Sequence, residues 1–189
     1  PAADANHIRM SAGCGRRIVD MVRENLTPAA IINRAAVDNA VTVAMAMGCS
    51  TNAIIHLLAM ARRAGVNLTL DDLDAAGRHV PVIANIRPSG NTYLMEDFYY
   101  SGGLRGMMSR LKDKLNLHAL TVSGKTLGET LVGASVHHDD VIRTMDDPIY
   151  PEGSLAVLRG NLAPDGAVIK PAACDPRFLN HEGPALVFN

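Results

Sequence analysis

Three adjacent polar residues, Ser50, Thr51 and Asn52, stand between two apolar stretches and are the group in this sequence best suited to bind a ligand. Gly48 precedes them and suits the left-handed backbone conformation that ends a helix. Ser50 or Thr51 can then cap a new helix by accepting a hydrogen bond from a first-turn N–H. Free N–H donors and the positive end of a helix dipole favour a carboxylate or phosphate. The pattern predicts an anion site facing an interior or a domain seam, with a plain capped turn between two core helices as the alternative.

Histidine and cysteine residues are the other candidates for chemistry. His56 lies one turn into the new helix, where we expect a structural, hydrogen-bonded histidine or, alternatively, a supporting role near a bound substrate. The cysteines Cys14, Cys49 and Cys174 form no Cys-x-x-Cys pair and are odd in number. This number and spacing of cysteines predict reduced thiols in a cytoplasmic protein and no metal site in this chain. We expect each cysteine to be a small, buried hydrophobic residue.

Composition narrows the class of protein. The chain has 189 residues, 48% of them hydrophobic, with a formal net charge of -1, which predicts an ordinary globular protein with a real core. The absence of a basic run and an aromatic content of 4% argue against nucleic-acid binding. Polar residues interrupt the longest apolar stretch, between residues 35 and 58, so no membrane span is expected.

Helices are expected on both sides of the polar turn. Asp4 or Asn6 can cap a first helix whose apolar residues would face the core, namely Ile8, Ile18, Met21 and Val22. Thr27-Pro28 opens a second, nearly all-apolar helix over residues 29–47, continuous or bent near Asn33. Later signals predict a helix from Thr69 or Asp71 to Arg78, an amphipathic helix over 104–115 and a capping box at 126–129.

Strands are expected mainly toward the end of the chain. Residues 80–86 are β-branched and apolar and predict one short buried strand. Composition changes between Gly133 and Gly153, which indicates an interdomain linker. Beyond it, residues 155–162 and 167–170 read as strands joined by a turn at 163–166, and residues 184–188 as a third strand. Such a tail is too small to hold a core alone, so it must pack on the first part or on further sequence.

The polar turn also carries a family resemblance. The run from Gly48 to Ala59, Gly-Cys-Ser-Thr-Asn-Ala-Ile-Ile-His-Leu-Leu-Ala, resembles a segment of the dihydroxy-acid dehydratase and phosphogluconate dehydratase family, with Cys49 replacing a glycine. Further matches follow in the same order at Arg87-Pro88-Ser89-Gly90, Met95-Glu96-Asp97 with Gly102-Gly103, Leu120 to Leu127, and Leu155 to Pro164.

The resemblance implies a fold and a reaction. It implies an α/β chain in which residues 1–133 are the mostly helical rear half of an N-terminal α/β domain, 134–152 a linker, and 153–189 the start of a C-terminal β-barrel domain. Members of this family remove water from 2,3-dihydroxy carboxylic acids to give 2-keto acids. They use an iron–sulfur cluster and Mg²⁺, and we expect a homo-oligomer acting on a small-molecule sugar acid or dihydroxy acid.

The family's metal ligands and serine base have no counterparts here. No Cys-Asp-Lys motif occurs, and Cys174-Asp175-Pro176 does not replace it. We therefore expect this chain to be a central fragment of a longer enzyme. The fragment alone would contain no catalytic residues, bind no cofactor and be inactive. Ser50, Thr51, Asn52 and His56 remain as candidates for contacting or supporting substrate.

Three functions remain open at this stage. Residues 95–100, 168–173 and 180–183 resemble the sugar-acid branch, with arabinonate or xylonate as substrates. The dehydratase of branched-chain amino acid biosynthesis is the second reading. A non-catalytic helical module that binds an anion or a partner is the third.

Overall fold

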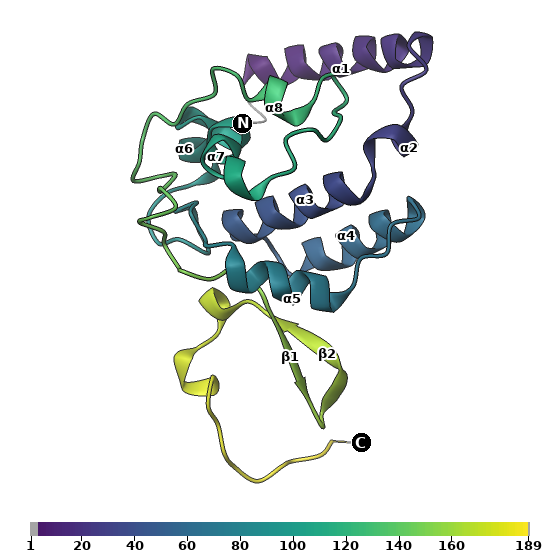
Figure 1. The fold of residues 1–189 in the computed structure, drawn as a ribbon. Coiled ribbons are helices and arrows are strands. Elements are labelled where there is room, and N and C mark those ends of the chain that lie inside the picture. The colour runs from purple at the N-terminus through teal and green to yellow at the C-terminus, as the bar shows by residue number, and fades with distance from the viewer. Residues whose placement is uncertain (1–3, 189) are drawn as a thin grey trace.

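The computed structural model describes residues 4–188, which form a helical body followed by a β-hairpin (Figure 1). The α-helices are α1 Ala5–Arg23, α2 Pro28–Ile31, α3 Arg34–Met47, α4 Asn52–Arg63, α5 Leu70–His79, α6 Met95–Tyr100, α7 Gly103–Arg110 and α8 Leu127–Thr130. Short 3-10 turns cover Lys112–Lys114, Pro171–Ala173 and Pro176–Phe178. The strands are β1 Ala156–Gly160 and β2 Ala163–Ile169. The chain is thus helix-rich with a small antiparallel sheet.

Helix α3 is the centre of the core. It packs against α4 and α5, and its residues Val37, Val41 and Met45 are buried. Asn39 is buried on the same helix, and its amide satisfies both backbone groups of Asn116: Asn39 Oδ1 accepts from N–H at 2.7 Å and Nδ2 donates to C=O at 3.0 Å. Pairing removes the cost of burying an amide in an apolar core.

Most predicted helix starts are confirmed. Asp4, Thr69 and Thr126 each accept a hydrogen bond from a first-turn N–H, and Thr69 and Thr126 form complete capping boxes. Thr27 precedes Pro28 as expected but makes no side-chain cap. The predicted bend near Asn33 is a full break, after which Asn33 caps α3 through the N–H of Ala36.

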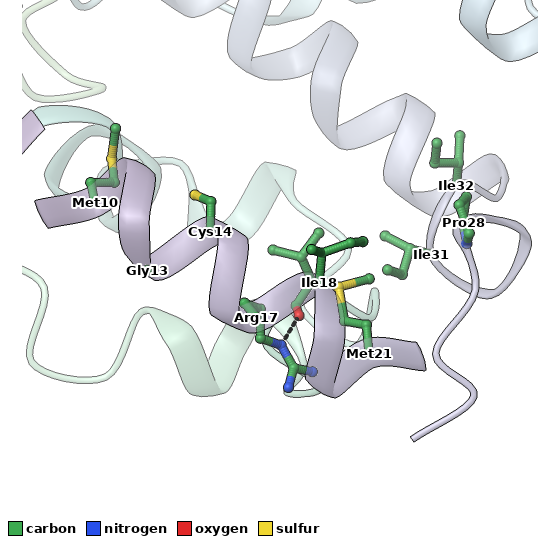
Figure 2. A pocket seen from close by; sticks show the side chains of 10 residues that line it. Met10, Gly13, Cys14, Arg17, Ile18, Met21, Pro28, Ile31 and Ile32 are labelled. Atoms are coloured by element: carbon green, nitrogen blue, oxygen red, sulfur yellow. Dashed lines mark hydrogen bonds between the residues drawn. The ribbon is translucent and has the colours of Figure 1, made fainter. Parts of the chain in front are cut away.

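The expectation that α1 turns its apolar residues to a core is wrong for this chain. Only Met21 is buried, whereas Ile8, Ile18 and Val22 are exposed. An open, mainly apolar cavity of about 730 Å³ follows the helix (Figure 2). Its lining also includes Pro28, Ile31, Ile32 and Val122. The helix is amphipathic as predicted, and Arg17 ties it to a distant segment by donating to the carbonyl of Val122 at 2.6 Å. Arg17 also pairs with Glu24, the residue that caps the same helix, at 2.7 Å.

The predicted strand over residues 80–86 is extended and buried but is not a regular strand. Val82, Ala84 and Ile86 each form one isolated bridge, to Tyr150, Ile142 and Tyr93 respectively. The partners lie on irregular segments, so no continuous ladder forms. The 134–152 segment therefore does more than connect, because Val141 and Ile142 are buried against this stretch. Its role as an interdomain linker stays a prediction.

The hairpin differs from the expected one in its turn. The connection is Asn161–Leu162, with Gly160 opposite Ala163, and Pro164-Asp165-Gly166 lie inside β2. Arg159 stands opposite these three residues, where the register shifts. Such a bulge tolerates proline, which cannot donate to the ladder, and a glycine at φ +104°.

The third strand and the barrel are not seen among residues 4–188. Residues 184–188 are exposed and form no strand, and the one sheet among residues 4–188 has two strands. A strand needs a neighbour for its backbone groups, and Figure 1 shows this tail as an irregular trace that curves round and ends below the tip of the β1–β2 hairpin. The helices of the described chain include none that is long and apolar enough to cross a membrane.

Candidate functional site

The predicted helix stop, polar turn and helix start are confirmed. Gly48 ends α3 in the left-handed region, at φ 79° and ψ 45°. Ser50 Oγ accepts from the backbone N–H of Asn52 at 3.2 Å and from its side-chain Nδ2 at 3.1 Å. Thr51 is the residue before α4 but makes no side-chain cap. The capping role therefore falls to Ser50.

The polar turn is open to solvent in this chain. The side chains of Ser50, Thr51 and Asn52 are exposed, so the expectation that they face an interior is not met within residues 4–188. The cause is the orientation of α4, which buries Ile54 and Ala61 on its inner face. Whether the turn faces a seam in a longer protein stays a prediction, as does its contact with a substrate.

His56 lies on the outer face of α4. It is exposed, and its side chain forms no hydrogen bond with any residue from 4 to 188, so the expected structural histidine is wrong for this chain. A helical rotation of 100° per residue places position 56 opposite Ile54 and on the same face as Asn52, four residues earlier. The structure thus brings Asn52 and His56 onto one exposed surface at the start of α4.

The turn is anchored through the C-terminal carbonyls of α3. The Gly48 carbonyl accepts hydrogen bonds from Ser89 Oγ at 2.8 Å and from Lys170 Nζ at 2.9 Å. The Ala46 carbonyl accepts from the N–H of Ile83 at 2.9 Å. The last carbonyls of a helix lack intrahelical partners, so these distant segments satisfy groups that would otherwise be left unpaired.

Sequence reasoning missed Ser89 and Lys170 as parts of this site. The available signal was their position in segments that carry the family resemblance, Arg87 to Gly90 and Val168 to Ala173. Neither segment has a helical or alternating pattern that points to Gly48.

Cys49 is half-buried and lies near Ser154 and Lys170. Burial raises the pKa of its thiol, while a hydrogen bond with Ser154 and the charge of Lys170 act against that rise. Burial in turn lowers the pKa of Lys170. A thiol with a raised pKa is a weak nucleophile at neutral pH, so Cys49 serves as packing here.

The remaining cysteines differ from the expected small buried hydrophobes. Cys14 is exposed on α1 and Cys174 is half-buried after β2, and all three thiols are free. Across the described part of the chain, no three His, Cys, Asp or Glu side chains gather closely enough to hold a metal ion. The residues from 4 to 188 therefore do not fit an iron–sulfur cluster or Mg²⁺.

The sequence that folds into this helical body and hairpin matches one protein family in two parts. The dihydroxy-acid/6-phosphogluconate dehydratase N-terminal domain matches residues 1–130, and the C-terminal domain of the same family matches residues 140–189. The chain belongs to this dehydratase family, as the resemblance implied.

Three relatives show the range within the family. The chain is 48% identical to a 6-deoxy-6-sulfo-D-gluconate dehydratase from Pseudomonas putida and 47% identical to an L-arabinonate dehydratase from Rhizobium leguminosarum bv. trifolii. It is 43% identical to a dihydroxy-acid dehydratase from Clostridium botulinum. Each match covers 100% of this chain but only 33% or 34% of the relative, so the chain spans about a third of the length of the curated relatives it matches.

Proposed function

We propose that this chain is part of a hydro-lyase that converts a sugar acid such as arabinonate or xylonate to its 2-keto-3-deoxy acid. The observation that carries the proposal is the Ser50-Thr51-Asn52 turn at the N-terminus of α4, in a chain of the dehydratase family. Helix N–H groups and the positive dipole end favour the substrate carboxylate. Asn52 and His56 lie on the adjoining exposed surface, which can contact the hydroxyl groups of a sugar acid.

The reaction defines what the rest of the protein must supply. Loss of the C2 proton and the C3 hydroxyl releases water and leaves an enol, which tautomerises to the 2-keto acid. This needs an acid at the departing hydroxyl, a base at C2 and a cation for the developing enolate charge. We assign none of these roles to residues 4–188. The catalytic groups, an iron–sulfur cluster and Mg²⁺ belong in our proposal to other parts of a longer homo-oligomeric protein, in which residues 153–189 begin a β-barrel.

Two considerations favour a sugar acid. Two relatives named for sugar-acid substrates share 48% and 47% identity with the chain, against 43% for the dihydroxy-acid dehydratase. In addition, the sequence resembles that of the sugar-acid branch of the family in the segments 95–100, 168–173 and 180–183. The dihydroxy acid of branched-chain amino acid biosynthesis is the second candidate, because that 43% match also covers the whole chain.

The test uses the dehydratase-length protein that contains these residues, reconstituted anaerobically with iron, sulfide and Mg²⁺. We expect 2-keto acid from L-arabinonate or D-xylonate, with kcat/KM at least about tenfold above that for 2,3-dihydroxyisovalerate. Residues 1–189 treated identically should give no product. The reverse substrate preference would favour the second candidate.

Variants test the turn itself. Asn52→Ala should lower kcat/KM about tenfold or more, the size of one lost hydrogen bond to a charged or strongly polarised group. Asn67→Ala is the matched control, because Asn67 is also exposed but lies in the connection between α4 and α5. Equal kinetics for the two variants would remove the turn from the substrate site.

A further inference from the structure

The carbonyl of Gly48 is held by two donors that come from distant parts of the chain. Ser89 Oγ is 2.8 Å away, and its side chain is almost completely buried. Lys170 Nζ is 2.9 Å away and reaches the carbonyl from just beyond the end of β2. One backbone oxygen therefore joins the helical body, the residue 87–90 turn and the C-terminal hairpin.

The electrostatics of this contact suit a cation. Gly48 follows the last turn of α3, where the helix dipole is negative and carbonyls lack helical partners. Lys170 is half-buried, and burial lowers the pKa of its ammonium group. A charged group kept in such a place needs a fixed acceptor, and the Gly48 carbonyl is that acceptor.

The polar turn begins only two residues after this carbonyl. Ser50, Thr51 and Asn52 are exposed and gain little packing of their own. Their place is set by Gly48 before them and by the burial of Ile54 after them, which is 3% exposed. Because Gly48 is only two residues before Ser50, a change in its carbonyl direction redirects the turn.

We propose that Lys170, together with Ser89, is a positioning residue that clamps the Gly48 carbonyl and so sets the geometry of the Ser50-Thr51-Asn52 turn. Docking of the C-terminal hairpin is thereby coupled to the candidate substrate-binding turn. The role of the clamp in catalysis rests on the proposed function, whereas its effect on the turn does not.

Hydrogen exchange on residues 1–189 tests the clamp without any activity. Three amides report on the turn: Cys49 N–H bonds the Ala44 carbonyl, Asn52 N–H bonds Ser50 Oγ, and Ala53 N–H bonds the Ser50 carbonyl. Lys170→Met should speed exchange of these amides about tenfold, because an opening that the clamp opposes becomes easier. Lys170→Arg keeps a charged donor and should stay within about twofold of the parent chain.

Two comparisons make the exchange result decisive. Lys114→Met is the matched control, since Lys114 is exposed and lies far along the chain in the Lys112–Lys114 turn. The amides of β1 and β2 report general undocking of the hairpin. A turn that responds more strongly than the hairpin supports the clamp; an unchanged turn, or one that responds no more than β1 and β2, overturns it. Ser89→Ala should reproduce the local effect from the other donor.

Kinetic measurements on the dehydratase-length protein test whether the clamp contributes to catalysis. Lys170→Met should lower kcat/KM about tenfold at unchanged iron content, and Lys170→Arg should restore most of it. If Asn52→Ala has no kinetic effect while exchange still responds to Lys170→Met, the proposed contact between the turn and the substrate fails and the clamp stands. If Asn52→Ala impairs turnover but Lys170→Met does not, the positioning role is wrong.

Discussion

Gly48 is the residue on which the local geometry of the candidate site depends most directly. Its φ of +79° is unfavourable for a side chain, and a Cβ at this position would overlap both Oγ and Cβ of Ser89. Gly65 has nearly the same φ, +75°, but a Cβ there would meet nothing within 4 Å. The two glycines therefore separate backbone strain from steric crowding.

We expect Gly65→Ala to lower the free energy of unfolding by about 1 kcal/mol, from left-handed strain alone. Gly48→Ala should lower it by about 3 kcal/mol, because displacement of Ser89 adds an overpacking cost. Urea unfolding of residues 1–189 measures both values. Equal losses would show that Ser89 moves away without cost.

Helix α5 shows how one short element combines capping and charge pairing. Asp72 accepts from both the N–H and the hydroxyl of Thr69 at 2.8 Å and pairs with Arg34 at 2.9 Å. The hydrogen bond from Arg34 and then those from Thr69 lower the pKa of the Asp72 carboxyl. The start of α5 is thereby tied to α3, where Arg34 is the first residue.

This pairing predicts a pH-dependent stability. A carboxyl with a lowered pKa in the folded state stabilises the protein fully above its unfolded pKa of about 3.9 and loses that contribution as pH falls through the lower folded value. Asp72→Asn should therefore cost about 1 kcal/mol near neutral pH, and the difference from the parent chain should shrink as pH falls below about 4. Urea unfolding of both proteins, at several pH values from neutral to below about 4, measures this difference in the free energy of unfolding.

Asp146→Asn is the control for this series, because Asp146 is exposed and has no ion pair with any residue from 4 to 188. Its stability difference should stay near zero throughout. A cost for Asp72→Asn that persists unchanged at the acidic end would mean that shape, rather than charge, explains the contribution of Asp72.

At the scale of the whole molecule, docking of the hairpin depends on a close approach of two backbones. The N–H of Gly153 donates to the Gly77 carbonyl at 2.6 Å, and a Cβ on Gly77 would lie 2.8 Å from the Leu155 carbonyl oxygen. Polar contacts extend this interface, since the N–H of Val157 donates to Asp74 at 3.2 Å. Of the two alternatives expected for the C-terminal tail, its hairpin takes the first and packs on the earlier part of the chain.

Gly77→Ala should consequently destabilise the protein by about 2 kcal/mol and expose the hairpin to proteases, even though alanine favours helices. Gly15→Ala is the matched control inside α1, where a Cβ meets nothing within 4 Å, and it should stabilise by up to about 1 kcal/mol. Thermal unfolding and limited proteolysis measure both effects. Stabilisation by both substitutions would show that the hairpin adjusts freely.

Features whose partners lie within about four residues could be predicted from the amino-acid sequence. The caps at Thr69 and Thr126, the stop at Gly48 and the polar turn before α4 are of this kind, because their hydrogen bonds close within one helical turn. Family membership was also readable, since its motifs are contiguous.

Features that depend on a partner distant in sequence became visible only in the folded chain. The donors on Gly48 come from positions 41 and 122 residues away, so no local pattern reveals them. The outward direction of His56 depends on α4 burying Ile54 and Ala61 instead, and the exposure of α1 depends on what the rest of the fold covers. Amphipathic spacing specifies which residues share a face, but the neighbouring elements decide whether that face is buried.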